Sequence, residues 1–255
     1  MTNNIMNIKW NSEDYAKNFS FVHEYGKGVM DLVDEGSGVA VDLGCGTGAL
    51  TGGLSAKGYD VIGIDASPEM LAQAVKGFPG IKFIQSDALT FSLEKKASVI
   101  FSNAVFHWID RDKQDELARN MSEQLLPGGV LVTEFGGKGC AESVHSALED
   151  SFARRGLVYP RTFFFPTVGE YAQILERNGL SVRYALFFDR PTEQKSGHGI
   201  KDWICMFVKK PFEGMDEALK EEIMDEAEES VRDKLYKNGK WFVDYVRIRI
   251  KAVKC

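Results

Sequence analysis

Glycines and acidic side chains that could bind a nucleotide follow successive short apolar runs of this 255-residue chain. The richest segment is Asp42-Leu43-Gly44-Cys45-Gly46-Thr47-Gly48, between a predicted buried strand and a predicted helix. Glycines there let the backbone approach a ligand and direct free N–H groups at it. Asp65 ends the next apolar run, where it could accept hydrogen bonds from both hydroxyls of a ribose, and Asp87 follows the third run. We therefore expect the three features to line one crevice.

The segments between these features alternate between strand-like and helix-like patterns. Strands are predicted at residues 39–41, 61–64, 81–85, 98–101 and 130–132, and helices at 49–57, 67–76 and 110–125. Such alternation predicts an α/β fold, a Rossmann-like doubly wound sheet with helices on both faces. Right-handed crossovers would place the loops after the strands at one edge, where ligands bind.

The pattern changes after residue 135. Helices are predicted at 141–154, 167–178, 199–208 and 216–237, the second opened by a capping box from Thr167 to Glu170. Residues 181–188 and 241–253 are predicted to form an antiparallel final hairpin, since residues 244–251 alternate apolar and basic side chains. The expected sheet is therefore seven-stranded, mostly parallel with an antiparallel last strand.

Composition excludes several classes of protein. Hydrophobic residues make up 44% and charged residues 27% of the chain, which is ordinary for a soluble globular protein. The net charge of −6 argues against nucleic acid as a partner, because phosphate-binding proteins usually carry a basic surplus. The longest uncharged apolar stretch, near residues 97–109, is too short for a membrane span of ~20 residues.

Cysteine and histidine spacing argues against metal binding. The four cysteines form no C-x-x-C pair and fit a reducing cytoplasm, and the first residues lack the pattern of a signal peptide. His23, His145 and His198 have no metal-like spacing, so no metal site is expected. Oligomeric state is left open by the sequence.

The same glycines leave two other functions open. Gly44-x-Gly46-x-x-Ala49 also matches the dinucleotide fingerprint, so an NAD(P)-dependent oxidoreductase is one alternative. Such an enzyme needs an acid or base near the hydride, yet the chain's one Tyr-x-x-x-Lys, Tyr236 to Lys240, contains a predicted Asn238-Gly239 turn. A non-catalytic nucleotide-binding module is the other alternative.

Taken together, these motifs resemble the class I S-adenosylmethionine-dependent methyltransferases. Residues 42–48 look like the first motif of that family, and Asp65, Asp87 and Leu126-Pro127-Gly128-Gly129 look like its later motifs. The segment Ser102-Asn103-Ala104-Val105-Phe106-His107-Trp108-Ile109 is similar, more narrowly, to the trans-aconitate methyltransferase-like branch.

The resemblance extends over nearly the whole chain and implies a separate function for each part of it. It includes Trp10-Asn11-x-x-x-Tyr15 and Asp189-Arg190-Pro191-Thr192. It implies a single domain with an N-terminal helical lid at 1–38, a cofactor-binding core at 39–135, and substrate-side insertions with the final hairpin at 136–255.

By this resemblance, the glycine loop would hold the methionine part of S-adenosylmethionine. Asp65 would bind the ribose, Asp87 and Ala88 would meet the adenine, and Tyr15 would cover the cofactor from the lid. The cofactor-binding residues expected in this way are Tyr15, Asp42, Gly44, Cys45, Gly46, Gly48, Asp65, Ala66, Met70, Asp87, Ala88 and Asn103.

Other residues are candidates for the substrate side. His107, which directly follows the fourth strand region, is the candidate catalytic residue, either orienting substrate or acting as a base; the alternative is a histidine that only holds its loop. Arg247 and Arg249 face the same way on the last strand and could bind an anionic substrate through bidentate hydrogen bonds. A solvated strand face is the alternative for this pair.

Aromatic residues supply the remaining candidates. Trp108 is expected at the pocket wall. Tyr159 and residues 163–165 either cover the substrate or fill core.

The sequence therefore predicts a methyltransferase that transfers a methyl group from S-adenosylmethionine to a small molecule, with a carboxylate as the leading acceptor. The reaction requires alignment of nucleophile, carbon and sulfur. A carboxylate needs no general base, whereas an amine or a phenol can require one.

Overall fold

The strands of the computed structural model, which describes residues 26, 28–195 and 199–255, form one mixed sheet. Their bounds are β1 Val39–Leu43, β2 Asp60–Asp65, β3 Lys82–Gln85, β4 Ala97–Asn103, β5 Leu125–Gly136, β6 Leu180–Gln194, β7 Tyr236–Lys237 and β8 Lys240–Lys254. The order is β3-β2-β1-β4-β5-β8-β6, and β7 pairs with β8. Neighbours among β1–β5 are parallel, whereas β8 is antiparallel to β5 and β6. The predicted mixed sheet is confirmed, with the two-residue β7 making eight strands instead of seven.

The described helices are α3 Thr51–Ala56, α4 Pro68–Gly77, α5 Gln114–Gln124, α6 Glu142–Arg154, α7 Val168–Arg177, α8 Ile200–Phe207 and α9 Glu217–Leu235. Three of them, α4, α7 and α9, begin at a capping side chain. Ser67 caps α4 by accepting from the Met70 N–H, and Thr167 and Glu170 form the predicted capping box of α7. Within the described residues, no helix is both long and apolar enough to cross a membrane.

Two predicted boundaries move because of local geometry. The helix predicted at 110–125 begins as a short 3-10 turn at Arg111–Lys113, so α5 itself starts at Gln114. β5 starts at Leu125, before the predicted residue 130, because Leu125 already pairs with Ala97. A shift of register between Ala97 and Val99 accommodates the Pro-Gly-Gly segment that follows.

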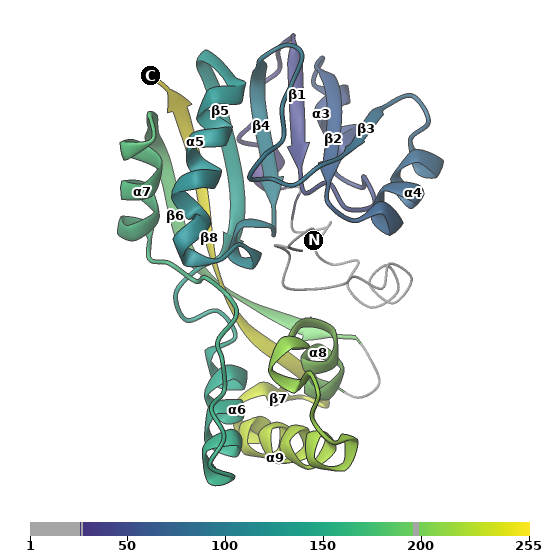
Figure 1. Cartoon of the computed structure of the whole chain (residues 1–255), viewed down its shortest axis with the longest axis vertical. Helices are drawn as coiled ribbons and strands as arrows, with labels where there is room; N and C mark the ends of the chain where they lie inside the picture. Colours follow the sequence, from purple (N-terminus) through teal and green to yellow (C-terminus); the bar gives the residue numbers. More distant parts are fainter. Residues whose placement is uncertain (1–25, 27, 196–198) are drawn as a thin grey trace.

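Alternate residues of the parallel strands face two separate hydrophobic cores. Val41 and Ile100 belong to the core that α5 and α7 cover. Their neighbours Ala40 and Val99 belong to the core on the opposite face, together with Leu54 of α3. Figure 1 shows α5 and α7 lying in front of the sheet. Both faces are therefore covered, and this leaves the carboxyl ends of the strands as the place for a site.

A third hydrophobic core lies beyond the carboxyl ends of the parallel strands. β6 and β8 continue past the rest of the sheet and reach α6, α8 and α9, which lie below the sheet in Figure 1. Trp203 of α8, Ile223 of α9 and Val243 of β8 are among its buried members. The arrowhead of β1 points toward this core in the same view. The chain after residue 136 thus completes the sheet and also builds a wall opposite the strand ends.

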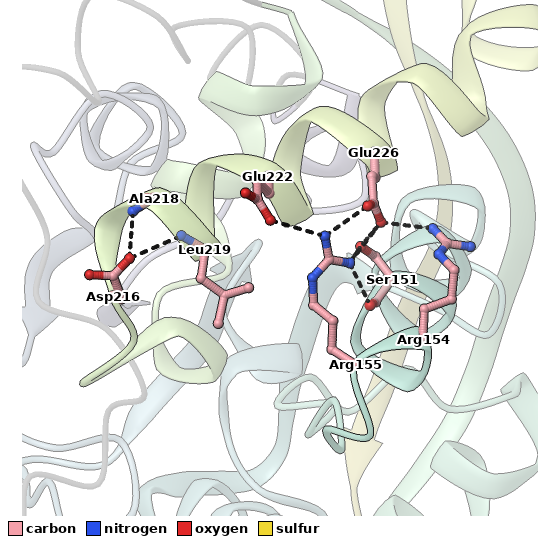
Figure 2. Close-up of polar contacts among 8 residues, drawn as sticks. All are labelled: Ser151, Arg154, Arg155, Asp216, Ala218, Leu219, Glu222 and Glu226. Carbon is pink, nitrogen blue, oxygen red and sulfur yellow. Dashed lines mark hydrogen bonds and ion pairs between the residues drawn. The ribbon is translucent and has the colours of Figure 1, made fainter.

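A charge cluster, consisting of Ser151, Arg154, Arg155, Glu222 and Glu226, joins α6 to α9 (Figure 2). The Glu226 carboxylate accepts hydrogen bonds from Arg155 at 2.7 and 2.8 Å, from Ser151 at 2.6 Å and from Arg154 at 3.0 Å. Glu222 lies 3.5 Å from the Arg155 guanidinium. The Arg155 hydrogen bonds, followed by those of Ser151 and Arg154, hold the pKa of Glu226 far below its usual range.

We expect Glu226→Gln to lower the thermal midpoint of unfolding at neutral pH, because a neutral amide loses the charge-assisted bonds. The Glu226 contribution exists above its unfolded pKa, near 4.5, and is lost as the pH falls toward the depressed folded pKa. The difference between wild type and variant should therefore shrink in increasingly acidic buffer. Circular dichroism melts measure this. The control is Glu213→Gln, because Glu213 is exposed and forms no ion pair within the described chain. Equal midpoints at neutral pH for the wild type and Glu226→Gln would contradict the expectation.

Candidate active site

The glycine loop after β1 has three left-handed glycines with three different surroundings. Gly44, Gly46 and Gly48 have φ values of 75°, 54° and 80°. A Cβ on Gly44 would lie 2.3 Å from the Val105 side chain, and one on Gly48 would lie 3.0 Å from Phe78. A Cβ on Gly46 would meet nothing within 4 Å. Gly44 and Gly48 therefore permit close packing, and Gly46 leaves the backbone open toward the crevice.

Asp65 ties the glycine loop to the end of β2. Its Oδ2 accepts a 2.8 Å hydrogen bond from the Gly46 N–H, and its Oδ1 accepts one of 2.8 Å from the Ser67 N–H. The residue is buried, and this burial raises the pKa of its carboxyl despite the backbone hydrogen bonds, which lower it. The carboxylate is thus held in one orientation, with lone pairs left for a ligand.

Asp42 is a second buried carboxyl at the same strand edge. Its Oδ2 accepts a 2.6 Å hydrogen bond from the Thr51 hydroxyl. Burial, and to a lesser degree the charge of Asp65, raises the pKa of Asp42 to about 7. A cation bound beside Asp42 would stabilise its charged form, so the site is matched to a positively charged ligand group.

The crevice extends along the ends of β1, β2, β3 and β4. One part is lined by Asp65, Ala66, Asp87 and Ala88, and the Asp87 carboxylate also accepts from the Leu89 N–H at 2.8 Å. The other part, which shares Gly44, Asp65, Val105 and Trp108 with the first, is lined by further expected residues: Asp42, Cys45, Gly46, Met70, Asn103, His107 and Arg247. The structure therefore brings most of the predicted cofactor residues to one edge.

Three expected site residues fall elsewhere, and a fourth is outside the described residues. Gly48 packs against Phe78 and does not line the crevice in the described structure. The Tyr159 hydroxyl lies 2.8 Å from Nδ1 of His145 in the third hydrophobic core, where Tyr159 is 8% exposed. Arg249 forms an ion pair with Glu134 at 2.7 Å and does not line the crevice in the described structure. Tyr15, like most of the expected lid, lies outside the described residues.

His107 is a buried residue whose geometry suits a donor. Its Nδ1 accepts from the Gly136 N–H at 3.3 Å, which leaves the proton of the neutral ring on Nε2. Burial and the nearby Arg247 charge hold the pKa of His107 well below its usual value. A neutral imidazole with its acceptor nitrogen occupied cannot take a proton from a substrate through Nε2. His107 can donate one hydrogen bond, and this favours orienting substrate over general-base catalysis.

Arg247 presents a buried cation to the crevice. It is 7% exposed, and within the described residues it has no ion pair, and no hydrogen-bond partner for its Nε. Its guanidinium stacks over the Tyr245 ring at 4.6 Å from the centroid. Arg247 pairs across the sheet with Gly136, the residue that binds His107, so the two candidate substrate groups belong to one local arrangement.

The remaining wall of the crevice is aromatic. Phe163 and Phe165 line it, whereas Phe164 between them is 4% exposed and packs into the core beneath α7, so the three residues divide between pocket and core. Sequence reasoning missed Trp203, Phe207, Cys140 and Tyr245 as lining residues. The apolar face of the predicted 199–208 helix was the available signal for Trp203 and Phe207. Where that face packs depends on the long antiparallel pair of β6 and β8.

The Tyr-x-x-x-Lys segment has no place in this site. Tyr236 pairs with Trp241 and Lys237 with Lys240, and Asn238 and Gly239 have φ values of 53° and 78°. These residues form the tight turn of the β7–β8 hairpin, as predicted, and neither Tyr236 nor Lys240 lines the crevice in the described structure.

Comparison with known proteins gives consistent matches. A family model described as "Methyltransferase domain" matches residues 40–129. The uncharacterized methyltransferase C70.08c of Schizosaccharomyces pombe is 28% identical over 264 residues, covering 96% of this chain and 98% of that protein. The trans-aconitate 2-methyltransferase of Methylobacterium nodulans is 33% identical over 132 residues, 49% of each protein. The crystal structure of an S-adenosylmethionine-dependent methyltransferase from Mesorhizobium loti superposes with a TM-score of 0.54 at 18% identity, over 91% of this chain and 98% of that one.

The fold and these matches together define the class of protein. These findings support a class I S-adenosylmethionine-dependent methyltransferase with S-adenosylmethionine as its cofactor. They argue against the oxidoreductase interpretation of the same glycines.

The residues of the crevice fit that cofactor. The open side of Gly46 leaves room for a ligand against bare backbone, and Asp65 offers oriented oxygen atoms to hydroxyl groups. Asp42 supplies a carboxyl whose charged form a cationic ligand would favour. We expect these residues to hold the methionine and ribose parts, with Asp87 beside the adenine.

We expect Asp65→Ala to weaken S-adenosylhomocysteine binding by ~1.5–3 kcal/mol, the scale of hydrogen bonds to a charged group. Isothermal titration calorimetry measures the loss. Asp60→Ala, at the exposed start of the same strand, is the matched control and should bind as the wild type does. Unchanged affinity in Asp65→Ala would contradict the ribose assignment.

We also expect S-adenosylmethionine to bind more tightly as the pH rises from about 6 to about 8. The pKa of Asp42 is raised to about 7, so its negative charge, which attracts the sulfonium, forms over this range. Asp42→Asn should remove the pH dependence of the affinity in calorimetric titrations. A pH-independent wild-type affinity, or a dependence that persists in the variant, would show that another group is responsible.

Proposed function

We propose that this methyltransferase acts on a small-molecule carboxylate and forms a methyl ester. The observation that carries the proposal is the buried guanidinium of Arg247, which lines the crevice without an ion-pair partner among the described residues. A buried charge without a partner is costly, and a bound carboxylate would remove that cost. The relative named trans-aconitate 2-methyltransferase, similar over half of the chain, is consistent with such an acceptor.

Arg247 and His107 have complementary roles in this proposal. The guanidinium offers several donors in a planar fork that matches the geometry of a carboxylate. The Nε2–H of His107 adds one neutral donor from the neighbouring strand end. Together they would orient the acceptor and fix its distance from the cofactor, and orientation of this kind can supply ~7–11 kcal/mol of a barrier.

The site needs no general base for this reaction. When bound, S-adenosylmethionine supplies a methyl carbon activated by a sulfonium, so a C–O bond forms, a C–S bond breaks, and the electron pair stays on sulfur. A carboxylate is already ionised at neutral pH and releases no proton. His107, held neutral with its Nδ1 occupied, and Arg247 therefore suffice on the acceptor side.

The chain's walls would also exclude water from the reacting atoms. Trp108, Phe207 and Tyr245 are each less than one-tenth exposed and line the crevice with Arg247. A dry surrounding strengthens the attraction between the guanidinium and a carboxylate.

We expect Arg247→Met to lower kcat/KM for a carboxylate acceptor by about 2 kcal/mol or more, roughly thirty-fold, because it removes the charged partner. Cofactor affinity should stay near the wild-type value. Methyl transfer from labelled S-adenosylmethionine across carboxylates, amines and phenols measures the change, and mass spectrometry identifies the ester.

For the wild type, kcat at saturating cofactor should show no step near the ordinary histidine pKa, since His107 does not titrate there. Methylation of amines or phenols but not carboxylates would overturn the proposed function. Cofactor binding without transfer to any of the three classes would favour a non-catalytic binding module.

A further inference from the structure

Resting on the proposed function, we infer that the acceptor is an aryl monocarboxylate: one carboxylate group on a flat, apolar, aromatic body. The inference depends on how the crevice distributes charge and apolar surface around Arg247. Among the described lining residues, Arg247 is the single Lys or Arg, and most of the others are aromatic or apolar.

The wall that lines the crevice with Arg247 presents both ring faces and ring edges. Phe163 and Phe165 stack at a centroid distance of 5.2 Å with an interplanar angle of 5°. The His107 ring lies 6.2 Å from Phe163 and 5.8 Å from Phe165, at 27° and 28°. The Trp108 ring is tilted by 55° to Phe163 at a centroid distance of 4.7 Å. Such a set of stacked and tilted rings favours a flat aromatic ligand, which can stack on a ring face or meet a ring edge to face.

Polar groups on the aromatic side chains of this wall already form hydrogen bonds within the protein. Trp203 donates through Nε1 to the Tyr245 hydroxyl at 2.6 Å, and Trp108 donates to the Ala104 carbonyl at 3.2 Å. The Cys140 thiol, also on the wall, stays neutral because burial raises its pKa. Beyond the carboxylate position, the acceptor would therefore meet apolar surface.

Charge around the crevice argues against a polycarboxylate. Among the described lining residues, Arg247 is the one Lys or Arg, and the other charged side chains there are the carboxyl groups of Asp42 and Asp65. A second or third carboxylate on the acceptor would be buried without a cation, against rings or facing those carboxyl groups, which carries a large desolvation cost.

The same charge argues against an amine acceptor in this part of the crevice. A cationic amine would face the Arg247 guanidinium, which also occupies the Tyr245 ring face at 4.6 Å that a cation–π contact would otherwise use. The aromatic wall together with the Arg247 cation therefore favours an anionic aromatic acceptor over a quaternary or protonated amine.

The experiment compares trans-cinnamate, a flat monocarboxylate, with trans-aconitate, a tricarboxylate with the same kind of double bond. Full-length enzyme is assayed with S-adenosylmethionine, and cinnamamide serves as the uncharged analogue. We expect kcat/KM for trans-cinnamate to exceed that for trans-aconitate by about 100-fold, and cinnamamide to give no methylated product.

Variants test the wall itself. Phe163→Leu should lower kcat/KM for cinnamate by about ten-fold through lost ring contact, while changing that for butyrate little. Phe187→Leu, the same substitution at an aromatic residue 46% exposed on β6, is the matched control and should leave both values unchanged. S-adenosylhomocysteine binding and circular dichroism show that each variant is folded.

The outcomes separate this inference from the proposed function. Ester formation with trans-aconitate in preference to trans-cinnamate would overturn the aryl monocarboxylate and leave carboxylate methylation standing. Cofactor binding with no ester from any carboxylate would overturn both. Ester formation from cinnamate that Phe163→Leu does not reduce would also contradict the aromatic wall as the determinant of specificity.

Discussion

The structure of this site depends on the energetic cost of burying charged side chains that have no ion-pair partner. The crevice contains the two buried carboxyl groups of Asp42 and Asp65 and the buried guanidinium of Arg247. Isolated charges of this kind destabilise a folded chain, and proteins normally pair them or shift their pKa. Asp42 responds by a shift of its pKa, which burial raises to about 7. Arg247 cannot respond in this way, because a guanidinium does not lose its proton in proteins.

The topology of the sheet brings these charges together. The parallel strands β1 and β2 end with Asp42 and Asp65 near their carboxyl ends, so the two carboxyl groups share one edge. β8 runs antiparallel beside β5 and brings Arg247 to the same edge from the opposite direction. Its extension beyond the sheet then packs against α8 and α9, and α8 contributes Trp203 and Phe207 to the aromatic wall. One long strand thus links the cofactor side, the anion site and the wall.

The sequence predicts that the expected cofactor residues lie at one edge of the sheet because their signals are local. The glycine loop, Asp65 and Asp87 each directly follow a recognisable strand, and a parallel sheet puts successive strand ends at one edge. The capping box at Thr167 and the turn at Asn238-Gly239 are local for the same reason.

The substrate side was less predictable because it depends on contacts between distant segments. The alternation of residues 244–251 indicates that Arg247 and Arg249 share a face. It does not indicate that Glu134 pairs with Arg249, or that Arg247 has no ion-pair partner in the part of the chain that the structure describes. Tyr159 is a candidate either to cover the substrate or to fill core, and its hydroxyl contacts His145 in the third core. Trp203 and Tyr245 joined the wall only through the packing of α8 on β8, which no local pattern encodes.

A crystal structure of the enzyme with S-adenosylhomocysteine and trans-cinnamate tests the central claim most directly. The account predicts the carboxylate within hydrogen-bond distance of the Arg247 guanidinium and His107 Nε2, with the aromatic ring against Phe163 and one carboxylate oxygen facing the sulfur. A carboxylate bound away from Arg247, or a guanidinium that remains without an anionic partner in that complex, would contradict it.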